Sequence, residues 1–270
     1  MHSVLGLMTC FNRKEKTIQS IYSLIAHNLN VRFRFIVVDD NSSDGTADAL
    51  RQIDGVRVIP GSGSLYYSGG MRMAISEALK DNETYDYCLL FNDDVDFFPQ
   101  SIEKMTENQD TDILVGATCD NDGKLSYGGV IKTSRLRPSF KIIDWTSPRA
   151  DSCDTFNANC VLIKWPVFRR LGNMDPVYTH SMGDFDYGFA ARGMGFQIKV
   201  QEGFVGTCCD NPVAGGWRDT ALPRSLRFRK KENPKGLPAK EWFHYLHKNY
   251  SFATACVYSV IPYIRIILKK

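Results

Sequence analysis

The sequence of 270 residues predicts an α/β fold, with a mixed but mainly parallel sheet flanked by helices and a helical extension at the C-terminus. In the first half of the chain, short apolar runs alternate with segments of helical periodicity. Strands joined by crossover helices run parallel and are covered on both faces. From about residue 222 the pattern is helical and basic. We expect one α/β domain at residues 1–220 and a basic helical extension at residues 221–270.

The predicted elements alternate strictly in the first half. Apolar runs predict strands, and apolar residues three or four positions apart predict helices. In chain order these are strand 4–8, helix 14–27, strand 33–38, helix 46–53, strand 56–59, a helix after the loop at 61–70, and strand 87–91. A dense turn signal at residues 39–45 ends the second strand.

The second half is less regular, with glycines that indicate hairpins between about residues 120 and 130. The remaining predicted elements are strands 113–117, 160–163 and 196–200, a helix at 184–192, and basic helices from residue 222, broken at 233–236. We find no internal repeat and no low-complexity linker in the sequence.

The charge pattern excludes one class of partner and leaves another open. A formal net charge of +3 is too small to indicate nucleic-acid binding. Residues 224–248 contain eight lysines and arginines but only two glutamates, which fits a solvated helical face or an anionic membrane or acceptor. Eight cysteines without a CxxC pair favour a reduced, cytoplasmic protein. We expect no signal peptide and no spanning helix.

Acidic residues collect where two predicted strands end. Asp39 and Asp40 follow one strand, and Asp93, Asp94 and Asp96 follow another. Ligands of open α/β sheets bind beyond the carboxyl ends of the strands. Clustered carboxylates repel one another unless a cation or donors are present, and no lysine is close in the sequence. One such cluster fits an ordinary turn equally well, but two favour Mg²⁺ or Mn²⁺ held together with a diphosphate.

Two further segments carry weaker signals. Gly69 and Gly70 precede a predicted helix, so free backbone N–H groups and the side chain of Arg72 there can face a phosphate. Asp184 opens another predicted helix, where it is either an N-cap or a base that takes a proton from an attacking hydroxyl. Asp186 follows two residues later.

Four stretches together resemble the family 2 glycosyltransferases of the GT-A fold, whose sheet is Rossmann-like. They occur in the family's order, at residues 9–13 (TCFNR), 36–46 (IVVDDNSSDGT), 89–95 (LLFNDDV, similar to the DxD-type metal motif) and 183–188 (GDFDYG, similar to the catalytic-base motif). Residues 65–72 (LYYSGGMR) resemble the rhamnosyltransferase-like and galactofuranosyltransferase-like branch.

The resemblance implies inverting transfer of a sugar from a UDP- or dTDP-linked donor to a glycan or lipid-linked acceptor, in the synthesis of a bacterial surface polysaccharide. It implies that Asp39 binds the nucleobase and that Asp94 binds the metal. It also implies that Asp184 removes the proton from the acceptor hydroxyl. Asp186 is implied as a supporting neighbour. The implied nucleotide-sugar-binding residues are Thr9, Asn12, Arg13, Asp39, Asn41, Gly69, Gly70, Arg72, Asn92 and Asp93, with Arg72 on the phosphates and Asn92 or Asp93 on the ribose side.

The sequence departs from the family pattern at two places. Asn92 occupies the first position of the DxD-type motif, so a ribose contact there is neutral. The family often supplies a histidine metal ligand after the last strand, but residues 207–210 read TCCD. Two consequences remain open: either the affinity for metal is lower, or Asp210 replaces the histidine as a ligand. Trp217, in a GGWR loop, is a candidate for stacking on an acceptor sugar. The alternative for it and for Trp145, Tyr178 and His180 is ordinary packing.

Alternatives remain at this stage. A nucleotidyltransferase that makes nucleotide sugars needs a glycine-rich signature after the first strand, and residues 10–14 contain no glycine. A non-catalytic nucleotide-sugar-binding protein would tolerate the loss of Asp184. A dinucleotide oxidoreductase is disfavoured, because no GxGxxG follows the first strand. The apolar segment 252–268 is too short and interrupted to span a bilayer. It predicts a helix at a membrane surface, packed on the domain, or in a homodimer contact.

Overall fold

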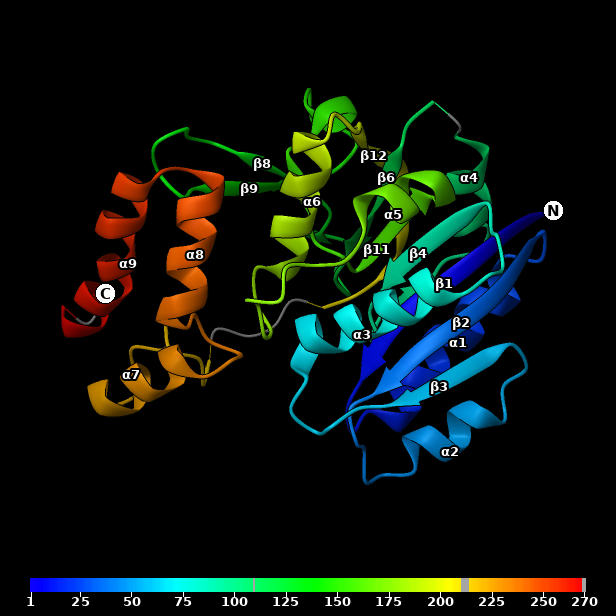
Figure 1. Ribbon diagram of the computed structural model, residues 1–270, viewed down its shortest axis with the longest axis horizontal. Coiled ribbons are helices and arrows are strands. Elements are labelled where there is room, and N and C mark those ends of the chain that lie inside the picture. Colours follow the sequence, from blue (N-terminus) through cyan, green and yellow to red (C-terminus); the bar gives the residue numbers. More distant parts are fainter. Residues whose placement is uncertain (109, 210–213, 269–270) are drawn as a thin grey trace.

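The computed structural model describes residues 1–108, 110–209 and 214–268, and it confirms the predicted α/β architecture (Figure 1). The main sheet has the order β3-β2-β1-β4-β11-β6-β12-β5, with β7 paired to β6. Its strands are β1 (His2–Cys10), β2 (Val31–Asp39), β3 (Val56–Pro60), β4 (Tyr87–Phe91), β5 (Asp96–Phe97), β6 (Ile113–Cys119), β7 (Leu125–Tyr127), β11 (Cys160–Lys164) and β12 (Ile198–Thr207).

The sheet is parallel where the chain alternates strand and helix. β1 pairs in parallel with β2 and β4, and β2 pairs in parallel with β3. β11 lies between β4 and β6 and is antiparallel to both, which makes the sheet mixed. A smaller antiparallel sheet joins β10 (Thr155–Phe156), β8 (Gly129–Lys132) and β9 (Phe140–Ile143) in that order, and a short 3₁₀ helix η1 spans Ala150–Ser152.

Helices cover both faces of the main sheet, since successive side chains of a strand point to opposite faces. In β1, Leu5 and Leu7 pack on the side of α3, whereas Val4 and Met8 pack on the side of α1. The helices on the first side are α3 (Tyr66–Lys80), α5 (Trp165–Leu171) and α6 (Gly183–Gly193). Those on the second are α1 (Lys14–His27), α2 (Thr46–Arg51) and α4 (Ser101–Glu107).

The C-terminal helices lie together at one end of the molecule, and two of them, α8 and α9, contribute to a third hydrophobic cluster (Figure 1). They are α7 (Arg224–Glu232), α8 (Ala239–Asn249) and α9 (Phe252–Ile267). Trp242, Tyr245 and Leu246 of α8 pack with Ala255 of α9 and with Tyr178, which is fully buried. The division into a domain at 1–220 and an extension at 221–270 stays a prediction. Within the described ranges, no helix has the length and apolarity to cross a bilayer.

Candidate active site

The carboxyl ends of β1, β2 and β4 lie at one edge of the sheet, where the first predicted site residues gather. Asp39 ends β2 opposite Cys10 of β1, and its carboxylate is 4% exposed. Its Oδ1 accepts hydrogen bonds from the backbone N–H of Ser42, at 3.1 Å, and from the Ser42 hydroxyl. Asn12 and Asn41 both have positive φ, as sharp turns require. Asn12 Oδ1 accepts from the N–H of Ser43 at 2.8 Å, which fastens the two turns together.

Asp40 accepts hydrogen bonds from the backbone around the start of α3, a role that the sequence did not indicate. Its Oδ1 accepts from the N–H of Gly63 at 2.7 Å, and its Oδ2 accepts from the N–H groups of Leu65 and Tyr66 at 2.9 and 3.1 Å. The carboxylate therefore satisfies backbone donors at the start of α3, where a negative charge also stabilises the helix.

The predicted phosphate-binding role of Gly69 and Gly70 rests on a wrong helix boundary. Helix α3 begins at Tyr66, so both glycines lie inside it, and the N–H groups of Ser68 and Gly69 donate to the carbonyl of Thr179 at 3.1 and 3.3 Å. A Cβ on Gly70 would lie 2.7 Å from the Cβ of Thr9 on β1. These glycines therefore allow the helix to approach β1 and the loop around Thr179, and the N–H of Gly69 is not free for a ligand.

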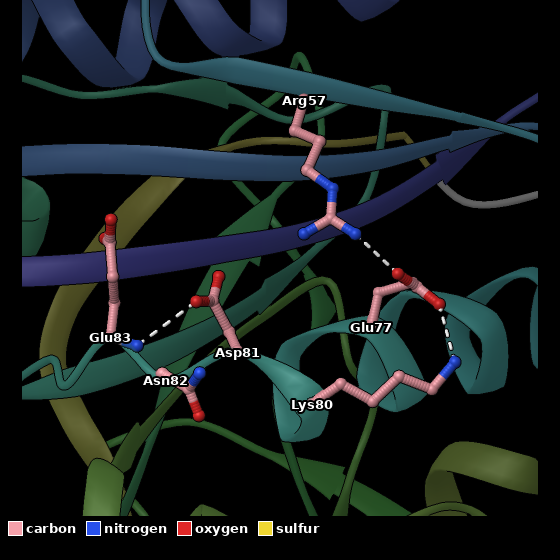
Figure 2. A pocket seen from close by; sticks show the side chains of 6 residues that line it. All are labelled: Arg57, Glu77, Lys80, Asp81, Asn82 and Glu83. Carbon is pink, nitrogen blue, oxygen red and sulfur yellow. Dashed lines mark hydrogen bonds and ion pairs between the residues drawn. The ribbon is translucent and has the colours of Figure 1, made fainter.

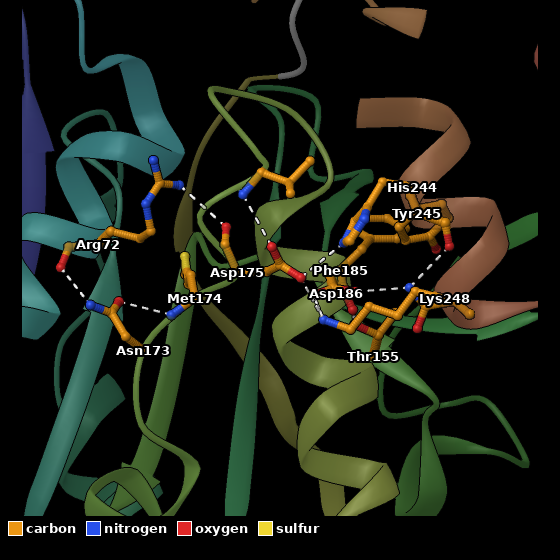
Figure 3. Close-up of polar contacts among 12 residues, drawn as sticks. Arg72, Thr155, Asn173, Met174, Asp175, Phe185, Asp186, His244, Tyr245 and Lys248 are labelled. Carbon is orange, nitrogen blue, oxygen red and sulfur yellow. Dashed lines mark hydrogen bonds and ion pairs between the residues drawn. The ribbon is translucent and has the colours of Figure 1, made fainter. Parts of the chain in front are cut away.

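Arg72 faces the loop that leads into α6 (Figure 3). Its Nη1 donates to the carbonyl of Tyr178 and, at 3.4 Å, to that of Asp175. Burial lowers the pKa of this guanidinium. The contact of Arg72 with the donor phosphates stays a prediction. Its Nη1 is already engaged by the two loop carbonyls.

Arg13 connects the turn after β1 to the DxD-type motif after β4. Its Nη1 lies 2.8 Å from Asp93 Oδ1 and 3.0 Å from Asp94 Oδ2. Burial raises the pKa of Asp93 to about 6, against the opposing effect of Arg13. The expectation of an unneutralised carboxylate cluster is wrong, because a guanidinium from 80 residues earlier in the chain lies between two of its members. Asp96 is exposed in β5 and accepts a hydrogen bond from Gln19 at 3.3 Å.

A cysteine, Cys208, directly follows β12, where the family often has a histidine. Cys208 Sγ lies 3.5 Å from Asp94 Oδ1, and Asn159 Nδ2 donates to that sulfur at 3.4 Å. Asn92 joins the same group, because its N–H donates to the Asn159 carbonyl at 3.3 Å. Sequence reasoning missed Asn159, and it left Cys208 without a role. Asp210, the suggested substitute ligand, lies outside the described residues.

The carboxylates after β4 fit a divalent cation shared with a substrate. Among the residues that the structure describes, no three His, Cys, Asp or Glu side chains form a complete metal cage. Mg²⁺ is commonly bound by one or two carboxylates together with substrate phosphates, so a complete cage is not required. The guanidinium between Asp93 and Asp94 shows that this pair accommodates a positive charge. Asp94 is the more accessible of the two, with 22% of its side chain exposed against 10% for Asp93.

Asp184 lies at the start of α6 and is linked to the same edge of the sheet. Its Oδ2 accepts from the N–H of Ala158 at 3.3 Å, and Ala158 is adjacent in sequence to Asn159. Its Oδ1 accepts from the N–H of Phe185 at 2.8 Å. Burial raises the pKa of Asp184 to about 6. The hydroxyl of Tyr67, whose pKa is raised by burial and by Asp184, is buried and has no hydrogen-bond partner in the described structure.

Asp186 lies on the same turn as Asp184 but has a different environment. Figure 3 shows it facing Lys248 of α8. Its side chain is 2% exposed, and it accepts from Lys248 Nζ at 2.7 Å and from Asn249 Nδ2 at 2.8 Å. Lys248 also lies 2.9 Å from Asp175 Oδ2, which is 2.9 Å from His244 Nε2 as well. Asp186 therefore fastens α6 to α8. No local pattern in the sequence indicated Lys248, His244 or Asp175.

The aromatic candidates divide by burial. Tyr178 is fully buried, and Trp145 packs edge-on against Phe204 at 4.7 Å between ring centroids, so both serve packing. His180 contacts the N–H of Tyr67, and burial lowers its pKa to about 4. Trp217 is partly exposed. Its role in acceptor binding stays a prediction.

A cavity of about 410 Å³ lies elsewhere, between the start of β3 and the end of α3 (Figure 2). It is lined by Arg57, Glu77, Lys80, Asp81, Asn82 and Glu83. Glu77 pairs with both Arg57 and Lys80, so three of the five charged lining residues are engaged with one another. The cavity lies toward the amino ends of the strands and is not part of the candidate site.

Comparison with known proteins supports the fold and gives a family. A family model described as glycosyl transferase family 2 matches residues 7–157. The mannosyltransferase PcManGT from Pyrobaculum calidifontis, in complex with GDP-Man and Mn²⁺, is similar with a TM-score of 0.57 and 14% identity, covering 98% of this chain and 73% of that one. S. aureus TarS 1–349 is similar with a TM-score of 0.54 and 12% identity, covering 98% and 81%. At these identities the structures show a shared fold. No curated protein sequence matches the chain.

Proposed function

The chain belongs to glycosyl transferase family 2, and from that premise we propose that it is an inverting, metal-dependent glycosyltransferase. It moves a sugar from a nucleoside-diphosphate donor to a hydroxyl of a glycan or lipid-linked acceptor. The observation that carries the proposal is the continuous link from Asp184 through the backbone at 158–159 and Cys208 to Asp94. This link brings a carboxylate of raised pKa to the edge of the sheet where the acidic motifs lie.

The donor is proposed to bind across the ends of β1, β2 and β4. Asp39 would accept the N3–H of a uracil or thymine base, which favours UDP- or dTDP-linked sugars. Asn92 Oδ1 is buried without a hydrogen-bond partner in the described part of the chain, and it would accept from a ribose hydroxyl. A buried unpaired acceptor costs free energy until a ligand satisfies it, so this atom supports a donor contact.

The diphosphate is proposed to lie against Asp94, Asp93 and Arg13. A bound Mg²⁺ or Mn²⁺ would neutralise the charge that develops on the departing diphosphate. Arg13 supplies a second positive charge at the same place, because its guanidinium is held there by both carboxylates. Cys208, whose sulfur accepts from Asn159, donates to Asp94 Oδ1, the carboxylate oxygen that Arg13 does not contact.

Asp184 is proposed to be the general base. The acceptor oxygen attacks the anomeric carbon on the face opposite the diphosphate, and Asp184 takes its proton as the bond to the diphosphate breaks. A base needs a pKa near the working pH, and burial raises that of Asp184 to about 6. Asp186 is engaged by Lys248 and Asn249, so it positions the helix and is not available to the acceptor.

The donor site is tested first by binding and then by turnover. Thermal shift with UDP, dTDP and GDP identifies the base, and hydrolysis of the matching donor sugars follows. We expect EDTA to abolish turnover, and Asp94→Asn to weaken donor binding chiefly when metal is present. Asp96→Asn, at an exposed neighbouring carboxylate, is the matched control and should change neither. Full turnover after EDTA treatment contradicts metal dependence, and donor binding without any turnover favours a non-catalytic binding protein.

The cellular setting is also a proposal. Segment 65–72 supports the rhamnosyltransferase-like and galactofuranosyltransferase-like branch, and with it a role in bacterial surface polysaccharide synthesis. We place the protein in the cytoplasm, at the inner face of the membrane, because lipid-linked acceptors are presented there. Screening donors of the two branches against the purified protein tests the branch directly.

A further inference from the structure

Helix α9 is apolar on both of its sides, and only one side is covered. Thr254, Ala255, Pro262 and Ile266 are buried against the rest of the protein. The opposite side, here termed the α9 face, consists of Ala253, Cys256, Val257, Val260, Ile264, Ile267 and Leu268, spaced three or four residues apart and all exposed.

The exposure of the α9 face is large for each side chain. Val257, Val260, Ile264 and Ile267 are 59%, 51%, 43% and 52% exposed. Figure 1 shows α8 between α9 and the body of the protein, so α9 is the outermost of the two helices. A helix that is apolar all round is ordinarily buried, and a contiguous exposed apolar patch marks an interaction site.

The charges beside the α9 face are mainly positive. The exception is Glu232 of α7, which accepts a hydrogen bond from the Tyr263 hydroxyl at 2.6 Å. Helix α9 contains no acidic residue, and its one charged residue, Arg265, is exposed. Arg218 is exposed as well, and its pKa is lowered by burial and then by the charge of Arg265. Within the described ranges, neither arginine has a carboxylate within 4.0 Å. Two neighbouring arginines without a counter-charge fit an anionic ligand.

Helix α7 packs on α9 and carries charges of both signs. Its Lys231 is buried and lies 2.6 Å from Glu232 Oε1, so only the arginines of α7 add exposed positive charge. Its Phe228 stacks on Tyr263 of α9, with ring centroids 6.2 Å apart, and Lys231 Nζ lies 4.0 Å from the same ring. Arg224 and Arg229 of α7 remain exposed. The surface thus combines an apolar helical stripe, a tyrosine at its edge and exposed arginines, which is the composition of helices that lie in a membrane interface.

We propose that the α9 face and the adjoining arginines dock the protein on an anionic phospholipid surface, with α9 lying in the plane of the interface. This deepens the membrane setting of the proposed function by assigning the residues that make the contact. A second copy of the chain is the less favoured occupant. Two α9 faces pressed together would bring both sets of Arg218 and Arg265 together without any carboxylate on α9 to neutralise them. The carboxylate of Glu232 on α7 already accepts from Lys231 and Tyr263.

Flotation of the full-length protein with vesicles tests the assignment. We expect wild type to float with vesicles of phosphatidylcholine and phosphatidylglycerol, and not with phosphatidylcholine alone. Replacing Val257, Val260 and Ile264 together by serine should abolish flotation. Arg218→Gln with Arg265→Gln should weaken it about 30-fold, because each basic residue near an anionic leaflet contributes about 1 kcal/mol.

The control uses exposed apolar residues on a distant helix. Tyr22 of α1 and the neighbouring Leu29 are 53% and 75% exposed, and replacing both by serine should leave flotation unchanged. Flotation of the triple serine variant at the wild-type level overturns the proposal, as does a wild type that does not float. Sedimentation can also show that the wild type is a dimer and the triple variant a monomer. If neither of them then binds vesicles, the α9 face belongs to a contact with a second copy, and the lipid proposal is overturned.

Donor hydrolysis without vesicles separates this proposal from the proposed function. None of the substituted residues is assigned to donor binding or to catalysis, so hydrolysis of the donor should remain at the wild-type rate in each variant. Hydrolysis without flotation refutes the lipid surface alone. Flotation without hydrolysis of any donor refutes the glycosyltransferase proposal and leaves the lipid surface standing.

Discussion

Asp184→Asn should make the protein more stable and much less active. Burial raises the pKa of Asp184 from an ordinary value of 3.8 to about 6. Since one pKa unit corresponds to about 1.4 kcal/mol, the ionised carboxylate costs the folded state about 3 kcal/mol at neutral pH. Asparagine carries no charge and keeps an oxygen that can accept from Phe185 or Ala158. Because the side chain is partly exposed, we expect a gain of about 1–3 kcal/mol in the free energy of unfolding.

The pH dependence of this gain has a definite sign. A carboxyl whose pKa is raised on folding imposes no cost below about pH 4, where it is neutral in both the folded and the unfolded state. The cost develops between about pH 4 and 6 and is complete above pH 6. Urea unfolding of wild type and variant should therefore give equal stabilities near pH 4 and the full difference near pH 7.5.

Activity should move in the opposite direction from stability. Loss of general-base catalysis lowers turnover by about 10²–10⁴-fold, while donor affinity should barely change. Asp186→Asn is the matched control, because it removes a buried carboxylate that Lys248 binds at 2.7 Å and should lower stability. An Asp184→Asn variant that is less stable than wild type at pH 7.5, or that keeps full turnover, would refute the reasoning. The pH dependence of stability identifies Asp184 more clearly than a pH–rate profile does. A transition near pH 6 in the rate could come from either residue, since the pKa of Asp93 is also about 6.

Two further predictions concern packing and the C-terminal helices. Gly70→Ala should lower the free energy of unfolding by about 1–3 kcal/mol, because its Cβ would lie 2.7 Å from that of Thr9. Thermal unfolding measures this against Gly193→Ala, whose Cβ would meet no atom within 4 Å, and equal stabilities of the two variants would contradict the packing argument. Lys248→Met should lower the free energy of unfolding by about 2–3 kcal/mol. This is at or below the low end of the loss expected when a fully buried ion pair is broken, because Lys248 is 40% exposed. The double variant with Asp186→Asn should recover most of that loss in urea unfolding, and no recovery would show that the ion pair is not the cause.

The sequence alone was sufficient for the alternation of strands and helices and for the approximate place of the acidic motifs. This information is local. Residues such as Leu5 and Leu7 repeat at the period of a strand, and the carboxyl ends of parallel strands meet at one edge whatever the details of packing. The family motifs are local as well, which is why they were recognisable one by one along the chain.

Helix boundaries and helix ends depended on tertiary contacts. Gly69 and Gly70 predicted a loop, because glycine weakens a helix interior. In the structure, α3 nevertheless starts at Tyr66, since Asp40 accepts from the first backbone donors and the helix packs closely on Thr9. Packing and capping outweighed a propensity of about 1 kcal/mol per residue.

The partners of the charged groups were decided by the tertiary structure alone. Asp184 and Asp186 are the same residue type on the same turn, so the sequence could separate their roles only by resemblance. Folding leaves Asp184 half-buried beside neutral backbone groups, and it places Asp186 against Lys248, 62 residues later in the chain. Arg13 reaches Asp93 across 80 residues. A sequence pattern records neighbours along the chain, whereas the pKa and availability of a carboxylate depend on the charges and solvent that folding brings to it in space.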